Sequence, residues 1–179
     1  MLTVFGAGGN IGAAVLCALG DFWVAGIVML LFSSIDFLDG ALARATGRAT
    51  DFGSVFDAVM DRVSEAAVLF GLLVWFSDKG GQTDELLIFV AVSGSMLVSY
   101  VRARAEIVGV SLREGLFTRE VRVAVLGIAL IVGGLRGGND VITWALWALA
   151  VLTVLTAAQR LWLVWRATRE ITDDSGQPG

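Results

Sequence analysis

Histidine is absent from this 179-residue sequence, and cysteine, proline and lysine occur once each, as Cys17, Pro178 and Lys79. Without histidine, a Ser-His-Asp triad, a histidine-ligated zinc and a histidine-ligated haem are all excluded. A single cysteine excludes an internal disulfide and a cysteine cluster for zinc or iron–sulfur. Carboxylates, arginines and hydroxyls are therefore the side chains that remain for chemistry.

Charged residues are also scarce, at 17% of the chain against 56% hydrophobic, and the mean hydropathy is +0.79. A soluble domain of this length cannot bury so much apolar surface in one core. Because the only proline is the penultimate residue, no proline interrupts a helix before it. We therefore expect an all-α integral membrane protein.

Six apolar stretches, each near the length that a helix needs to cross a bilayer, follow one another with short connections. We place them at residues 2–19, 22–43, 52–76, 85–108, 118–135 and 141–165. Helices joined by short loops pack antiparallel, so we expect a six-transmembrane-helix bundle with both termini on one side. Residues 1–169 would form one membrane domain, and residues 170–179 a polar, disordered tail.

The basic residues fall mainly on one side of these spans. Eleven of the thirteen lie at or near the junctions that follow the second and fourth spans, or near the end of the sixth span, and Lys79 and Arg136 are the exceptions. The positive-inside rule then places both termini in the cytoplasm of a cell-membrane protein. No secretory signal peptide is evident, since the first basic residue is Arg44. Nucleic acid is not an expected partner, because the arginines do not form a soluble basic face.

Four aspartates lie where a lipid-facing helix would not carry them. Asp36 and Asp39 are three residues apart near the end of the second span, and Asp57 and Asp61 are four apart near the start of the third. Both spacings place the two side chains on one helix face, and the short loop lets the faces meet. Four converging carboxylates require cations, and an all-oxygen ligand set favours Mg²⁺ or Mn²⁺. We expect two such ions, which could bridge a pyrophosphate during in-line displacement at phosphorus.

Residues between and beside these aspartates suit a nucleotide diphosphate. Gly40 and Gly53 allow close approach to the helix backbone, Arg44 can clamp a phosphate oxygen, and Thr50 offers a hydroxyl. The spacing alone leaves open which aspartate acts as general base. A proton or divalent-cation transporter also carries intramembrane aspartates, but transporters usually have repeated halves or broken helices, and no repeat is visible.

The whole pattern resembles the signature of the CDP-alcohol phosphotransferases, without a departure, in the string Asp36-x2-Asp39-Gly40-x2-Ala43-Arg44-x8-Gly53-x3-Asp57-x3-Asp61. These integral membrane enzymes move a phosphatidyl group from a CDP-linked lipid to an alcohol and release CMP. The resemblance implies that all four aspartates bind metal and that Asp61 also accepts the proton of the attacking hydroxyl. It further implies a CDP-lipid site at Gly40, Arg44, Thr50 and Gly53, and a homodimer.

The start of the sequence departs from the family pattern. Family members usually begin with a cytoplasmic amphipathic helix and a short polar stretch, and only residues 1–3 resemble the end of that stretch. The nucleotide contacts that the stretch makes in the family are therefore not carried over to this sequence.

Three arginines indicate the acceptor. Arg102, Arg122 and Arg160 would lie at similar depth on three helices, and converging arginines suit a phosphate dianion. Arginines at helix ends also serve topology, and Arg102 with Glu106 is an ordinary i, i+4 pair. The pattern resembles the prokaryotic phosphatidylinositol-phosphate synthases, which often have Lys where this chain has Arg102. The resemblance implies transfer from CDP-diacylglycerol to 1D-myo-inositol 3-phosphate, with another acceptor such as glycerol 3-phosphate as the alternative.

Small residues in the fourth span, Gly94 and Ser95, are suited to close helix packing. Free cysteine behaves as a small hydrophobic residue, so Cys17 is expected to be a packing residue. Glycines at 133–134 and 137–138 predict a turn after the fifth span.

Overall fold

The computed structural model describes residues 2–45, 50–79, 81–112 and 117–175, with side chains described for 6–38, 50–79, 81–112 and 117–169. Within these ranges the chain forms helices and no strand. The helices are α1 (Leu2–Leu19), α2 (Phe22–Ala45), α3 (Asp51–Lys79), α4 (Gln82–Ile107), α5 (Arg119–Arg136) and α6 (Asp140–Ser175).

Each of the six predicted spans corresponds to one helix, and the all-α, six-helix fold class is confirmed. Most helix ends differ from the predicted ends by three residues or fewer. The largest difference is at α6, which continues as a helix to Ser175, although a polar, disordered tail is predicted from residue 170 onward. The turn after α5 is also as predicted, since Gly137 has φ 66° and its N–H caps the helix.

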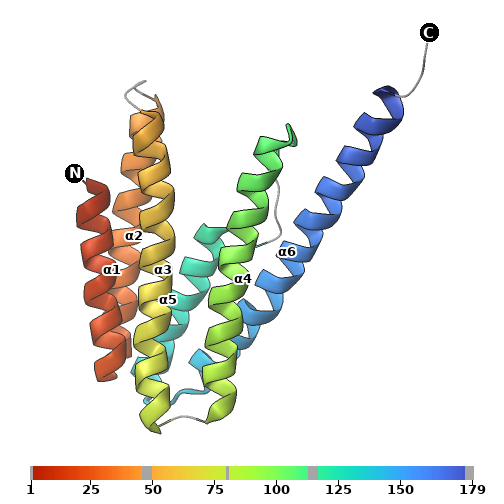
Figure 1. Cartoon of the computed structure of the whole chain (residues 1–179). Coiled ribbons are helices and arrows are strands. Elements are labelled where there is room, and N and C mark those ends of the chain that lie inside the picture. Colours follow the sequence, from red (N-terminus) through yellow and green to blue (C-terminus); the bar gives the residue numbers. More distant parts are fainter. Residues whose placement is uncertain (1, 46–49, 80, 113–116, 176–179) are drawn as a thin grey trace.

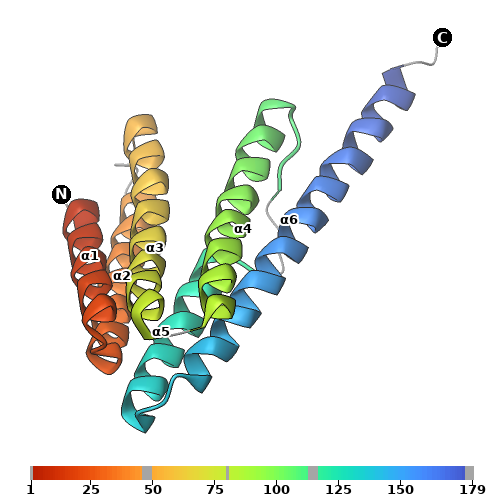
Figure 2. The ribbon, with the colours of Figure 1, turned by 60° about the horizontal axis from the view of Figure 1, so that its bottom comes forward.

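Successive helices run in opposite directions, so the start of α1 and the end of α6 lie at the same end of the molecule (Figure 1). Helix α1 packs on α2 and α3, α4 packs on α6, and α5 packs on both α2 and α6. Toward the end that holds both termini, α3 and α4 diverge, while at the other end they are joined by a short connection (Figures 1 and 2).

The apolar core lies mainly in the half of the molecule where α3 and α4 are joined. There, Phe22 and Phe76 are 5% and 1% exposed, and Trp75 contacts both rings edge to face. Cys17 is fully buried in this core, in agreement with its predicted packing role. The other half is therefore left with less apolar packing and carries the polar side chains.

Glycines allow the helices to approach closely. A Cβ at Gly71 of α3 would lie 2.1 Å from the carbonyl oxygen of Ala14 in α1, so only glycine is accommodated there. In the same way, a Cβ at Gly94 would lie 2.3 Å from the hydroxyl of Thr153 in α6. The predicted packing role of Gly94 is thus confirmed, and its partner is a helix of the same chain.

Two helices in the described part of the chain are long and apolar enough to span a membrane by hydropathy alone: α4 and residues Asp140–Arg169 of α6. Shorter apolar segments are Gly6–Leu19 and Phe22–Leu38. Helices α3 and α5 carry more charged residues, and several of these line a cavity inside the bundle.

Candidate active site

The aspartates predicted to bind metal come together between α2 and α3. Oxygens of Asp36, Asp57 and Asp61 all lie within 4.8 Å of one another. Asp57 and Asp61 are one turn apart on the same face of α3, as their spacing predicts. Three carboxylates at this separation form a donor set that fits a hard divalent cation such as Mg²⁺ or Mn²⁺. The residues present therefore fit the predicted metal.

The fourth aspartate, Asp39, belongs to the last turns of α2, as do Gly40 and Arg44. Their side-chain surroundings lie outside the described part of the chain, so their predicted roles remain predictions. On the α1 side, a Cβ at Gly6 would lie 3.3 Å from the Asp36 side chain. The absence of a side chain at Gly6 thus lets α1 pack directly beside the metal-ligand candidate.

Thr50 and Gly53 have a defined structural role at the start of α3. The Gly53 N–H donates a hydrogen bond of 3.0 Å to the Thr50 hydroxyl, which is the pattern of an N-terminal helix cap. A Cβ at Gly53 would lie 2.8 Å from the same hydroxyl, so glycine is suited to this position. This cap orients the first turn of the helix that carries Asp57 and Asp61. The predicted contact of both residues with the CDP-lipid remains a prediction.

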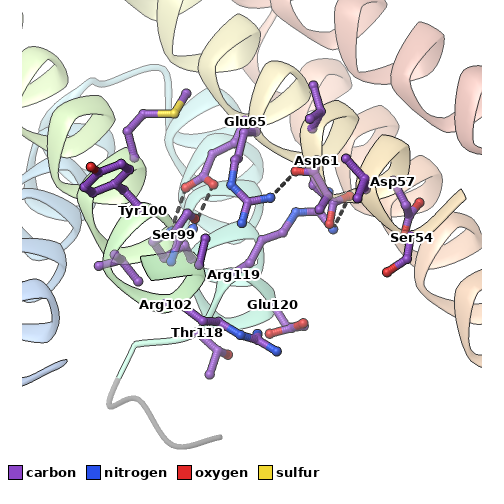
Figure 3. A pocket seen from close by; sticks show the side chains of 18 of the residues that line it. Ser54, Asp57, Asp61, Glu65, Ser99, Tyr100, Arg102, Thr118, Arg119 and Glu120 are labelled. Atoms are coloured by element: carbon purple, nitrogen blue, oxygen red, sulfur yellow. Dashed lines mark hydrogen bonds and ion pairs between the residues drawn. The ribbon is translucent and has the colours of Figure 1, made fainter. Parts of the chain in front are cut away.

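A cavity of about 980 Å³ adjoins the aspartates (Figure 3). Asp57 and Asp61 line it from α3, and the facing walls come from α4, α5 and α6. All three arginines predicted to bind the acceptor phosphate also line it, namely Arg102, Arg122 and Arg160. The structure therefore brings the acidic and the basic candidates to one cavity, although they are distributed over four helices.

Arg122 is the most fully bonded of the three arginines. Its Nε and Nη2 donate to the two carboxylate oxygens of Glu65 at 2.6 and 2.8 Å, and Nη2 also donates to the Ser95 hydroxyl at 3.0 Å. Nη1 donates to the Phe117 carbonyl at 3.2 Å. The side chains of Arg122 and Glu65 are only 4% and 5% exposed. Arg122 thus joins α3, α4 and α5 at the cavity wall, and one of its five N–H groups is left for a ligand.

Arg102 and Arg160 differ in their surroundings. Arg102 is exposed on the rim and forms a 3.4 Å ion pair with Glu106, one turn further along α4. Arg160 is buried, and its Nη1 donates a 3.0 Å hydrogen bond to the Val98 carbonyl of α4. The Nε atom of Arg160 is buried and has no hydrogen-bond partner in the described structure. Arg160 therefore retains unused donor capacity in a buried part of the cavity.

Two charged residues at this site did not enter our sequence-based site prediction. Glu65 continues the i, i+4 series of Asp57 and Asp61 on one face of α3, and this spacing was the available signal. Arg119, the first residue of α5, has Nη1 2.9 Å from Oδ1 of Asp61. Its partner is distant in the sequence, so no local pattern indicated the contact.

A family model described as CDP-alcohol phosphatidyltransferase matches residues 1–156. The chain therefore belongs to the CDP-alcohol phosphatidyltransferase family, a family of membrane proteins, and the predicted family membership is confirmed.

Among curated relatives, the chain is similar to phosphatidylinositol phosphate synthases. It is 37% identical over 147 residues to that of Mycobacteroides abscessus, a match that covers 81% of this chain and 65% of the relative. It is 36% identical over 174 residues to that of Mycobacterium marinum, and this match covers 92% of this chain and 72% of the relative. The chain thus spans about two thirds of the length of these relatives, and within its family it is phosphatidylinositol phosphate synthase-like.

Solved structures agree with this assignment. The crystal structure of Mycobacterium tuberculosis phosphatidylinositol phosphate synthase with CDP-DAG bound has a TM-score of 0.84 and 32% identity, covering 92% of this chain and 84% of that one. A structure of the same protein in complex with manganese and citrate also has a TM-score of 0.84, with 92% and 80% covered. The similar enzyme thus binds a divalent metal and a CDP-linked lipid, the two classes of ligand predicted for this chain.

Proposed function

We propose that this protein transfers a phosphatidyl group from CDP-diacylglycerol to a phosphorylated alcohol, namely 1D-myo-inositol 3-phosphate, and releases CMP. The products are phosphatidylinositol phosphate and CMP, so the reaction is a step of phospholipid synthesis. The single observation that carries this proposal is that Asp57 and Asp61 line the same cavity as Arg102, Arg122 and Arg160.

The acidic side of the cavity supplies the chemistry in this proposal. Asp36, Asp39, Asp57 and Asp61 hold two divalent ions, which neutralise charge on the pyrophosphate when they are bound. The Asp61 carboxylate takes the proton of the attacking hydroxyl. The hydroxyl oxygen forms a bond to the β-phosphorus of the CDP-lipid, and the bond from that phosphorus to the oxygen of CMP breaks.

The neighbouring residues of α2 and α3 position the donor. Gly40 and Gly53 allow its pyrophosphate to approach the backbone, while Arg44 and Thr50 donate hydrogen bonds to its phosphates. Thr50 is exposed at the start of α3, which is consistent with contact to a ligand as well as with its capping role.

The basic side of the cavity selects the acceptor. Arg102, Arg122 and Arg160 bind the phosphate of the inositol phosphate, and an acceptor without a phosphate leaves these cations without a partner. The one N–H of Arg122 that its four hydrogen bonds leave over and the unpartnered Nε of Arg160 support this role.

The experiment that tests the proposal is a CMP-release assay. Purified protein is incubated with CDP-diacylglycerol, Mg²⁺ or Mn²⁺, and one acceptor at a time: 1D-myo-inositol 3-phosphate, free inositol or glycerol 3-phosphate. We expect CMP with inositol 3-phosphate, little CMP with free inositol, and none after chelation with EDTA.

Each other outcome of the assay contradicts a specific part of the proposal. CMP formed mainly with glycerol 3-phosphate would overturn the assigned acceptor but keep the transfer chemistry. No CMP with any acceptor, together with cation or proton flux in proteoliposomes, would show a transporter. Undiminished CMP release in EDTA would overturn the metal site.

We further propose that the cavity opens toward the cytoplasm and that the protein is a homodimer in the cell membrane. Of the cavity-lining arginines, Arg102 lies near the end of α4, and Arg119 and Arg122 lie at the start of α5, on the side of the molecule that holds both termini and is rich in arginine in the sequence. Crosslinking in native membranes tests the dimer, since a homodimer gives a band at twice the mass of the chain.

A further inference from the structure

The ion pair between Arg119 and Asp61 joins the basic wall of the cavity to the acidic one. Nη1 of Arg119 lies 2.9 Å from Oδ1 of Asp61, and the two side chains are 21% and 20% exposed. Figure 3 shows the Arg119 side chain directed from α5 across the cavity toward Asp61 on α3. Asp61 belongs to the three aspartates whose oxygens cluster within 4.8 Å. The positively charged side chain of Arg119 therefore contacts Asp61, a carboxylate that is suited to bind metal.

The guanidinium of Arg119 is held by fewer contacts than that of Arg122. Arg122 uses three nitrogens on Glu65, Ser95 and Phe117. By contrast, the Nε of Arg119 is buried and has no hydrogen-bond partner in the described structure. An arginine held by one ion pair can exchange its partner more readily than one held by a bidentate pair and two further hydrogen bonds.

A carboxylate that neutralises an arginine binds a divalent cation less strongly, because the two cations repel each other and share the same oxygens. When the divalent cation takes the Asp61 carboxylate, the Arg119 guanidinium loses its partner. It then faces a cavity that, under the proposed function, receives two phosphorylated substrates. A guanidinium recognises a phosphate through paired N–H donors. The position of Arg119, between the aspartates and the other arginines, suits such an exchange.

We propose that Arg119 is a positioning residue that competes with the divalent cation for Asp61 and, once the cation is bound, pairs with a substrate phosphate instead. This proposal rests on the proposed function, since it needs both the metal site and a phosphorylated substrate. The phosphate belongs either to the diphosphate of the CDP-lipid or to the acceptor.

Binding of Mn²⁺ to the detergent-solubilised full chain, followed by the loss of the free-ion EPR signal, tests the competition. Arg119→Gln removes the positive charge, and we expect its Kd for Mn²⁺ to be about five-fold lower than that of the wild type. Arg119→Lys keeps the charge and should retain a Kd close to that of the wild type. A merely structural role for Arg119 would predict the opposite sign, because a disturbed site binds metal less well.

Arg62→Gln is the matched control. Arg62 lines the same cavity and is adjacent to Asp61 in α3, but its Nη1 donates to the Ala58 carbonyl one turn back. The Kd of Arg62→Gln for Mn²⁺ therefore measures the general effect of losing one positive charge near Asp61. The proposal requires a clearly larger gain in Mn²⁺ affinity for Arg119→Gln than for Arg62→Gln, and equal gains would overturn it. If Arg119→Gln does not fold, Arg119→Met gives the same comparison while keeping an apolar stem.

Steady-state kinetics with Mn²⁺ saturating test the second half of the proposal. Arg119→Gln should raise KM by about ten-fold for the substrate whose phosphate Arg119 binds, either CDP-diacylglycerol or the phosphorylated acceptor. Unchanged KM values for both substrates would overturn the exchange. Wild-type protein that binds no Mn²⁺ would overturn the proposed metal site as well, whereas normal wild-type binding with no effect of Arg119→Gln overturns this inference alone.

Discussion

Asp61 is common to three features of the candidate site. It belongs to the aspartate cluster, lines the cavity and forms the ion pair with Arg119. The sequence spacing leaves all four aspartates equivalent as candidates for the general base. In the structure Asp61 lies where the acidic and basic walls of the cavity meet, and this position supports its proposed role as the base.

The first prediction concerns this carboxylate. Asp61→Asn removes the proton acceptor while keeping the size of the side chain, so CMP release should fall by at least about a hundred-fold. Binding of the CDP-lipid, measured by calorimetry in detergent, should be retained. A variant with near-normal turnover would show that another group is the base.

Arg122 presents a different case at the residue scale, because it has both a structural and a proposed substrate-binding role. Its bidentate pair with Glu65 is almost fully buried. Removal of one partner from such a pair leaves an uncompensated buried charge, which costs about 3–5 kcal/mol. A simple Arg122→Ala substitution therefore disturbs stability as well as the acceptor site.

The second prediction separates these two effects. Arg122→Leu and Glu65→Leu should each lower the free energy of unfolding by about 3–5 kcal/mol, while the double variant should recover most of this loss. If Arg122 binds the acceptor phosphate, the stable double variant should still show a KM for the phosphorylated acceptor raised at least ten-fold, with little change for the CDP-lipid. Equal increases for the two substrates would contradict the acceptor role.

At the scale of elements, the position of α3 governs the site, because α3 carries Asp57, Asp61 and Glu65. One end of α3 is capped by Thr50. Its middle is packed against α1 at Gly71, where the backbone of Ala14 occupies the place of a side chain. These two contacts, one local and one tertiary, set where the acidic face of α3 lies.

The third prediction tests the tertiary contact. Gly71→Ala inserts a Cβ 2.1 Å from the Ala14 carbonyl oxygen, so α1 and α3 must separate, and we expect a loss of about 1–3 kcal/mol. Gly12→Ala in α1 is the matched control, since a Cβ there meets nothing within 4 Å. Thermal unfolding in detergent should show a lower midpoint for Gly71→Ala only. Similar midpoints for the two variants would mean that α1 and α3 are not closely packed in the membrane.

At the scale of the whole molecule, polar and apolar packing are divided between the two ends. The aromatic contacts of Phe22, Trp75 and Phe76 lie where α3 and α4 are joined, and α3 and α4 diverge toward the end with both termini (Figure 2). The cavity lies between α3 and α4 where they diverge, and residues of α3, α4, α5 and α6 line it. The cavity is therefore separate from the apolar core that holds the other end of the bundle together.

The fourth prediction concerns the orientation of this arrangement. Lys79 is the only lysine, and it is exposed at the end of α3 opposite the two termini. If the termini are cytoplasmic, a membrane-impermeant amine reagent should label Lys79 in intact cells, and Lys79→Arg should abolish that labelling. Labelling that needs cell lysis would indicate the reverse orientation.

The sequence predicted the elements well because each helix is encoded locally. The predicted span at residues 2–19 has the bounds of α1, since apolar residues and a Gly20–Asp21 turn delimit it. The clustering of Asp36 with Asp57 and Asp61 was also predictable, because the two helices are consecutive and joined by a short loop. The end of α6 was less predictable, since polar residues continue a helix as readily as they end it.

What the sequence determined by itself is the set of helices, the membrane setting and the acidic motif, because these depend on hydropathy and on spacing within one or two neighbouring helices. What only the tertiary structure decided is which residues oppose one another across the cavity. Arg119 contacts Asp61 and Arg122 contacts Glu65 over separations of more than fifty residues. Such contacts depend on how the helices pack, and packing is set by close approaches such as Gly71 on Ala14, which no local pattern encodes.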